Sequence, residues 1–361
     1  KKLSLAGRFF LERGVGGDFD GCNGVPIRYR TFTHMKGPQI APGIVLVTGW
    51  SESFPKYAET IYDLYNMGYS VYTYDHRSQG FSGKEEGNLP HTTHILSFDD
   101  YVNDLQTFVD KVVPNKKDLV LLGHSTGCLI GSLAYLDHQE KHKGMEVPPL
   151  FSKAVWMAPL VDPVTLPLMP SRVAGVIARA MCFVGRGAKG MFGCGNPLSS
   201  SVDEMNLSHD PQRRNLWTAI REKMPEVQIQ DGPTFRWLAE TVKACIRFRK
   251  KASNLKMPVT VFTSKMDTYV NNKATARVIR KLPYVKSFHL ENSYHDILLE
   301  EDGVRDCALD RIKSFLQDEH LSLSFIEDDQ TSRVPKRRFL GRMRQKVVSL
   351  ARFMKNKTRV A

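Results

Sequence analysis

The segment "LLGHSTGCLIG" at residues 121–131 puts Ser125 between two glycines, Gly123 and Gly127. A buried-strand pattern, "DLVLLG", runs directly into it, and a helical pattern, "TGCLIGSLAYLDH", follows. A G-x-S-x-G motif alone is weak evidence, but a strand before it and a helix after it are the context that a nucleophile elbow requires. Such an elbow leaves the backbone N–H of Thr126 at the helix start, free to hold an oxyanion. The alternative interpretation is a turn serine without chemistry.

Strand and helix patterns alternate along most of the chain. Buried-strand patterns occur at 43–49, 69–75, 118–123, 152–159, 257–265 and 284–292, and helical patterns at 55–68, 97–113, 126–138 and 302–317. Two opening stretches, "AGRFFLER" (6–13) and "VPIRYRTFTH" (25–34), are interpreted as β-strands. The alternation predicts an α/β fold with a mostly parallel central sheet covered by helices on both faces.

A long interruption separates the last two strand patterns from the earlier ones. About a hundred residues is too long for a loop, so this part is predicted to be an insertion with helices of its own. We expect residues 1–161 and 251–320 to form the core, 162–250 the insertion and 321–361 a basic C-terminal tail.

A serine nucleophile needs a base, and the base needs a carboxylate that orients it. In a fold of this kind the partners follow in the order serine, acid, histidine, each just past a strand. Asp267 follows the strand pattern "VTVFTS", and His295 follows the next one, "SFHLEN". His289 competes for the base, but it lies inside the strand pattern. Asp296 is adjacent to His295 and is expected to point elsewhere.

The second oxyanion donor is expected in the turn after "GIVLVTG" (43–49). The residue that follows is Trp50, and its backbone N–H is the candidate. Its side chain has a simpler interpretation, which is packing over the mouth of the pocket.

With these residues identified, the chain resembles the α/β-hydrolases of the lysophospholipase and monoacylglycerol lipase type, especially the bacterial lysophospholipases of the inner membrane. The resemblance implies that Ser125 is the nucleophile, His295 the base and Asp267 its partner, with the N–H groups of Trp50 and Thr126 as the oxyanion hole. It also implies that the insertion is a lid over an acyl-binding groove. The matching blocks are "LVTGWSESFPKYAETIYDLYNMGYSVYTYDHRSQGFSG", "GHSTGC", "DGPTFRWLAE", "SKMDTYV" and "NSYHDILLEEDGVRDCALDRIKSFL".

Three positions depart from the family's usual residues. Thr48 stands where a histidine normally precedes the oxyanion-loop glycine, Ser78 replaces a glycine after Arg77, and Cys128 replaces the second glycine that ends the elbow. None of these changes removes a catalytic group. The first one bears on how the oxyanion loop is braced.

The net charge of +13 is concentrated at the C-terminus. Residues 333–361 hold eleven Lys or Arg and no acid, which leaves +2 for the rest of the chain. Apolar residues recur there at helical spacing, so the tail is predicted to be an amphipathic helix that binds an anionic membrane surface. A disordered solubilising tail is the alternative, and no nucleic-acid partner is expected because no reading motif is present. The apolar residues are Phe339, Leu340, Met343, Val347, Leu350, Ala351 and Met354.

Other features of the composition bear on the compartment. The six cysteines are scattered, without the spacing of a disulfide framework, which favours reducing surroundings. No uncharged apolar run of about 18 residues or more is present, and Arg8 interrupts the apolar N-terminus, so no signal-peptide core is visible. The chain lacks an initiator Met, and residues before Lys1 could have been removed. These features predict a cytoplasmic protein, peripheral on the inner face of the membrane.

No metal or organic cofactor is expected. "GRGAKG" (185–190) matches G-x-G-x-x-G, but a dinucleotide site needs a preceding strand, so a glycine-rich hinge is favoured. His138 and His142 lie four residues apart without an evident third metal ligand.

Together these features predict a serine hydrolase that cleaves the carboxylic ester of lysophospholipids through an acyl-enzyme. A monoacylglycerol lipase is the near alternative. A catalytically silent α/β-hydrolase scaffold used for binding is the alternative from another class.

Overall fold

The computed structural model describes residues 2–36, 38–85, 92–165, 169–191, 207–223 and 232–318, with side chains up to residue 220 in the fifth range. Within these ranges the central sheet has eight strands in the order β1-β2-β6-β5-β8-β9-β11-β12. The first two pairings of that order, β1 with β2 and β2 with β6, are antiparallel, and every later pairing is parallel. The strands are β1 (Val15–Asp20), β2 (Pro26–Phe32), β5 (Gly43–Val47), β6 (Ser70–Tyr74), β8 (Val120–His124), β9 (Lys153–Met157), β11 (Val259–Ser264) and β12 (Val285–Leu290). The predicted α/β class is therefore confirmed.

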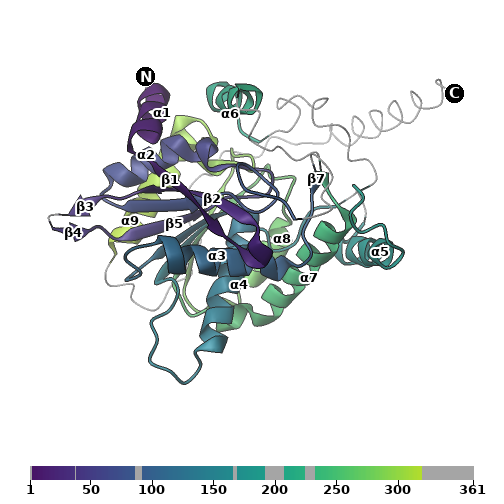
Figure 1. Cartoon of the computed structure of the whole chain (residues 1–361). Helices are drawn as coiled ribbons and strands as arrows, with labels where there is room; N and C mark the ends of the chain where they lie inside the picture. Colours follow the sequence, from purple (N-terminus) through teal and green to yellow (C-terminus); the bar gives the residue numbers. More distant parts are fainter. Residues whose placement is uncertain are drawn as a thin grey trace, which may run out of the picture. The chain divides into compact units, whose positions relative to one another are not determined.

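Alternate residues of the central strands enter two different cores, because side chains along a strand point to opposite faces. In β5, Ile44 and Leu46 pack in one apolar cluster, and Val45 and Val47 pack in another. The helices whose apolar residues join the first cluster are α1 (Lys2–Arg13), α2 (Ala58–Asn66) and α9 (Asp302–Gln317). Those that join the second are α3 (Phe98–Val112), α4 (Thr126–Lys141), α7 (Phe235–Lys251) and α8 (Asn272–Ile279), on the opposite face of the sheet (Figure 1).

The β-strand expected at residues 6–13 is wrong, because this stretch lies within helix α1. Its buried residues are Ala6 and Phe10, and Arg8 between them is exposed, whereas a strand would place all three on one face. Phe10 packs against Phe32 and Phe54, with ring centroids 5.3 and 6.1 Å away. The short aromatic run "RFFLER" has strand propensity, but packing on the sheet selects the helix.

The other predicted elements are present within a few residues of their expected ends. The helix expected at 97–113 is α3, and it begins at a capping box in which the Ser97 side chain and the Asp100 carboxylate bond each other's backbone N–H groups. The helix expected at 55–68 is a 3-10 turn (Phe54–Tyr57) that continues as α2. Short pairs complete the described strands: β3 (Met35–Lys36) with β4 (Gln39–Ile40), and β7 (Thr92–Thr93) with β10 (Gly232–Pro233).

The expected insertion contains α5 (Ser171–Phe183), α6 (Pro211–Lys223) and α7. Helix α7 packs into the main core, where Phe248 stacks edge-on against Trp156 of β9 at 5.7 Å. Helix α5 packs on α7 through a separate small cluster that includes Ala174, Ala178 and Val242. The domain limits and the lid role of the insertion stay predictions. The tail, residues 321–361, lies outside the described residues.

Candidate active site

Ser125 lies at the sharp junction between β8 and α4, with φ +50° and ψ −112°. Such a conformation is rare for a residue with a side chain and costs of order 1–3 kcal/mol. Backbone hydrogen bonds hold it: the Ser125 N–H donates to Met157 O at 2.9 Å, and Ser125 O accepts the N–H groups of Leu160 and Cys128 at 3.0 and 3.1 Å. The side chain makes no capping bond to α4, although Ser125 is at the N-cap position. The strained serine is thus fixed by its backbone and keeps its hydroxyl out of the helix cap.

The glycines of the elbow are required by close backbone approach. A Cβ on Gly127 would lie 2.1 Å from Val47 O, and one on Gly123 would lie 2.8 Å from the backbone nitrogen of Cys128. No side chain fits at such distances, so the turn requires glycine at both positions. Cys128, which departs from the family's usual glycine, is accommodated because its thiol donates to Gly123 O at 3.0 Å.

Asp267 and His295 form a buried pair. His295 Nδ1 lies 2.7 Å from Asp267 Oδ2, and the other carboxylate oxygen accepts the N–H groups of Tyr269 and Val270 at 2.8 and 3.1 Å. Burial raises the pKa of the Asp267 carboxyl, but the charge and hydrogen bond of His295 and the two backbone donors lower it more. The net pKa is below the ordinary value, so Asp267 is an anion that can orient an imidazole.

The two competitors of this pair point elsewhere. His289 lies in β12, is 46 % exposed and bonds Thr263 Oγ1 at 2.9 Å. Asp296 pairs with the ammonium of Lys56 at 2.7 Å. Neither residue is placed to replace Asp267 or His295.

The elbow and the His295 loop meet through His124, the residue before Ser125. The rings of His124 and His295 have centroids 4.8 Å apart, and His124 Nε2 lies 3.3 Å from His295 O. The structure therefore brings together, at the carboxyl edge of the sheet, the Ser125 elbow, the Asp267 loop and the His295 loop, which are separate in sequence.

Trp50 lies in the loop after β5, and its side chain packs against neighbouring elements. Its Nε1–H donates to Thr93 Oγ1 at 2.6 Å, and its ring lies 5.4 Å from that of Trp237 on α7. These contacts concern only the indole. The role of its N–H stays a prediction, as does that of Thr126.

The loop after β5, where the second oxyanion donor is predicted, is braced without the family's histidine at position 48. His76 Nε2 bonds Thr48 O at 2.9 Å, and the Gln79 amide donates to the carbonyls of Gly49 and Glu52, both at 2.9 Å. Because a carbonyl only accepts, Nε2 of His76 carries the proton. Burial lowers the pKa of His76 to about 4, so its ring is neutral at ordinary pH.

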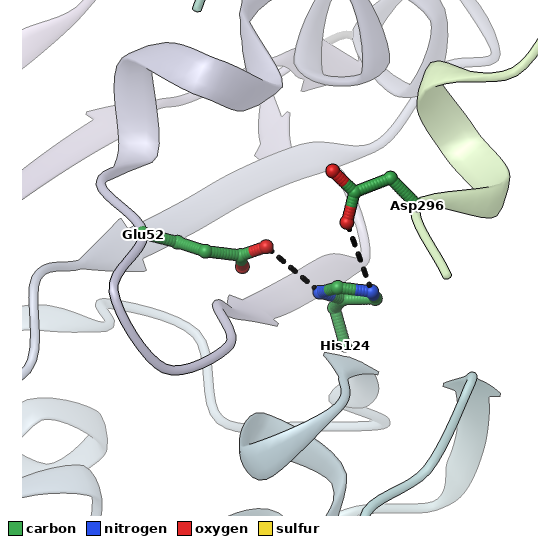
Figure 2. Close-up of side chains that lie close together, drawn as sticks. All are labelled: Glu52, His124 and Asp296. Carbon is green, nitrogen blue, oxygen red and sulfur yellow. Dashed lines mark ion pairs between the residues drawn. The ribbon is translucent and has the colours of Figure 1, made fainter. Parts of the chain in front are cut away.

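Sequence reasoning missed a buried ionic cluster beneath these loops, formed by Glu52, Lys56, His124 and Asp296. Figure 2 shows the His124 ring between the two carboxylates, with Nδ1 3.0 Å from Glu52 and Nε2 3.6 Å from Asp296. The Lys56 ammonium contacts Glu52 at 2.6 Å and Asp296 at 2.7 Å. The i,i+4 spacing of Glu52 and Lys56 was the available signal, but nothing in the sequence points to Asp296 as their partner.

The opposite charges of this cluster favour the ionised form of one another, as the pKa shifts show. Burial raises the pKa of Glu52, but His124 and Lys56 lower it more, to well below its usual range. Burial lowers the pKa of His124, but the negative charges of Glu52 and Asp296 bring it above its usual value. Glu52, His124 and Asp296 could offer three ligands to a metal ion. The Lys56 ammonium contacts both carboxylates, however, so a cation already balances them.

None of the helices in the described ranges is both long enough and apolar enough to span a membrane.

Comparisons with known proteins identify the family of this chain and agree with its fold. Residues 39–302 match the family model Hydrolase_4, described as serine aminopeptidase, S33. The chain is 28 % identical over 311 residues to a probable lysophospholipase L2 of Haemophilus influenzae, covering 85 % of this chain and 93 % of that protein. It is also 28 % identical to lysophospholipase L2 of Escherichia coli K12, covering 82 % and 86 %. A monoglyceride lipase structure from Saccharomyces cerevisiae superposes with a TM-score of 0.63 at 18 % identity, covering 84 % of this chain and 94 % of that one.

Proposed function

The chain belongs to the Hydrolase_4 family and is a carboxylic ester hydrolase of the lysophospholipase and monoacylglycerol lipase type, and we propose that its substrate is a lysophospholipid. The observation that carries the proposed chemistry is the buried His295–Asp267 pair on a loop that contacts the strained elbow of Ser125. Relatives that match most of this chain bear the name lysophospholipase, which supports the choice of substrate class.

In the proposed reaction Ser125 Oγ attacks the acyl carbonyl while His295 Nε2 takes its proton. Asp267 holds the imidazole by Nδ1 and stabilises the cation that forms. The N–H groups of Trp50 and Thr126 hold the oxyanion. The tetrahedral intermediate then releases the glycerophosphate ester, which receives the proton from His295.

Water completes the reaction by the same path in reverse. His295 removes a proton from water as it attacks the acyl-enzyme, and Ser125 leaves with that proton. The products are a free fatty acid and a glycerophosphodiester, and the enzyme returns to its starting state. No metal or organic cofactor takes part in these steps.

The solvent-exposed face of α5 carries both apolar and basic residues, which favours an amphiphilic substrate. Its inner face packs on α7, whereas several apolar residues face solvent beside the basic residues Arg172 and Arg179. An exposed apolar patch of this kind marks an interaction surface. We propose that the insertion, 162–250, covers the acyl groove as a lid. The exposed residues are Val173, Val176, Ile177 and Phe183 of α5 and Val184 directly after it.

The proposed setting is the cytoplasmic face of a membrane. Eleven basic residues without an acid in 333–361 would attract anionic lipids and hold the enzyme near its substrate. This proposal rests on the charge of the tail.

Mass spectrometry of fatty acid release from a panel of lysophospholipids and monoacylglycerols tests the substrate. We expect faster release from lysophospholipids, and none from either lipid with Ser125→Ala. Faster release from monoacylglycerols would replace the proposal with a monoacylglycerol lipase. A wild-type protein that releases no fatty acid and is not labelled by a fluorophosphonate probe would be a silent scaffold.

A further inference from the structure

The buried ionic cluster joins three loops, each of which carries a proposed catalytic group. Glu52 lies two residues after Trp50, His124 precedes Ser125, and Asp296 follows His295. No two of these loops are neighbours along the chain. Their side chains nevertheless meet within the distances of ion pairs (Figure 2).

Lys56 is the member that links the two carboxylates. Its side chain is 3 % exposed, and the ammonium lies 2.6 Å from Glu52 Oε1 and 2.7 Å from Asp296 Oδ2. The rings of Tyr57 and Trp217 each lie 5.9 Å from Nζ, which further limits access of water. Without this cation, two buried anions would face each other with only His124 between them, and such a charge is strongly unfavourable in the interior.

Glu52, which Lys56 holds in place, contacts the loop that carries Trp50. One of its oxygens accepts the backbone N–H of Gly49 and the Tyr57 hydroxyl, the latter at 2.6 Å. This bond fixes Gly49, the residue directly before the peptide that carries the Trp50 N–H, so the position of Glu52 bears on that donor; the Gly49 carbonyl itself accepts from the Gln79 amide at 2.9 Å. A Cβ on Gly49 would lie 2.9 Å from the Glu52 carboxylate, which shows how closely the loop sits on the cluster.

Asp296, the other partner of Lys56, limits the position of the proposed base, His295. It is directly bonded along the chain to His295, and the His295 carbonyl lies 3.3 Å from His124 Nε2. A buried ion pair by itself is weak evidence for stability, because desolvation offsets the attraction. A buried ion pair can, however, raise the catalytic rate by orienting side chains, since a misplacement of about 1 Å can lower the rate about a hundredfold.

We propose that Lys56 is a positioning residue that holds the oxyanion loop, through Glu52, and the His295 loop, through Asp296, in register with the Ser125 elbow. The inference rests on the proposed serine-hydrolase mechanism and adds a residue to it that touches neither substrate nor reacting atoms.

The experiment compares Lys56→Met, Lys56→Arg, Asp296→Asn and a control, Arg305→Met. Arg305 is also fully buried, and it contacts two acids of α2, Glu59 at 3.6 Å and Asp63 at 2.6 Å. It thus matches Lys56 in burial and charge but has no contact with the cluster. The measurements are kcat and KM for a water-soluble short-chain ester, the rate of fluorophosphonate labelling and the thermal midpoint.

With Lys56→Met we expect kcat and the labelling rate to fall by about 10- to 100-fold while KM changes by less than about threefold. Lys56→Arg retains the charge and restores most of kcat. Arg305→Met lowers the thermal midpoint but leaves kcat of the folded protein near wild type. If Lys56→Met does not fold, Asp296→Asn, which retains the shape of the side chain, should still lower kcat about tenfold.

Two results would overturn the inference. One is wild-type kcat and labelling in folded Lys56→Met or, if that variant does not fold, in Asp296→Asn. The other is an equal loss of kcat in Arg305→Met, which would assign the effect to stability. A wild-type protein that is neither labelled nor active overturns the proposed mechanism itself, and the inference with it.

Discussion

His295 Nδ1 lies 2.7 Å from Asp267 Oδ2, although 28 residues separate the two in the chain. The pair forms because β11 and β12 are adjacent parallel strands, so the loops after their carboxyl ends lie at the same edge of the sheet. Two backbone N–H groups hold the other oxygen of Asp267, which leaves Oδ2 for the imidazole.

Ser125→Ala should abolish ester hydrolysis while leaving the fold intact. Removing the nucleophile of such a triad costs about 10⁴–10⁶ in rate. Hydrolysis of a short-chain ester and far-UV circular dichroism measure the two effects. A folded variant that retains a tenth of the activity would disprove the assignment.

Asp267→Asn should cost far more activity than Asp296→Asn. An amide at 267 cannot stabilise the imidazolium or hold its tautomer, and the loss expected for this change is about 10⁴ in kcat. Steady-state kinetics of the two folded variants give the ranking. The reverse order would mean that Asp296 is the acid of the triad.

His76 should make folding sensitive to acid. Its pKa is about 4 in the folded protein and near its ordinary 6.5 when unfolded, so the unfolded chain binds the proton first as the pH falls. The stability that His76 contributes is therefore full above about pH 6.5 and is lost towards pH 4, by about 3 kcal/mol in all. Urea unfolding of wild type and His76→Gln at several pH values measures it. An unchanged difference between the two proteins from pH 7 to pH 4 would contradict the prediction.

Gly127→Ala should be strongly destabilising, by about 3 kcal/mol or more, because its Cβ would lie 2.1 Å from Val47 O on the neighbouring strand. Gly7→Ala is the matched control, since Gly7 lies within α1 and a Cβ there meets no atom within 4 Å. The control should gain roughly 0.5–1 kcal/mol from helix propensity. Chemical denaturation compares them, and similar stabilities would show that the elbow tolerates a shift of the strand.

Removal of residues 333–361 should release the protein from anionic vesicles and spare hydrolysis of a soluble ester. Each basic residue near an anionic surface contributes about 1 kcal/mol, so several acting together give strong binding that salt weakens. Co-sedimentation at low and high salt measures it. If the truncated protein pellets as fully as the intact one, the tail is not the anchor and the insertion becomes the next candidate.

Local patterns in the sequence were sufficient for most of the fold. The buried runs at β5, β8 and β11 are short, apolar and bounded by turn residues, so they could be assigned without knowing their neighbours. Residues 6–13 were assigned to the wrong class because a short apolar run has no decisive period, and its contacts with Phe32 and Phe54 lie outside the run.

The sequence by itself determined the strand–serine–helix junction at Ser125 and the chain order of Ser125, Asp267 and His295, because each of these residues follows a strand pattern formed by its immediate neighbours. Only the tertiary structure decided that Lys56 would join Glu52 to Asp296. Asp296 lies 240 positions after Lys56 in the chain. Charged residues are usually solvated, and nothing local distinguishes these from others. Burial at the meeting point of three loops turns them into a cluster, and burial is a property of the folded chain.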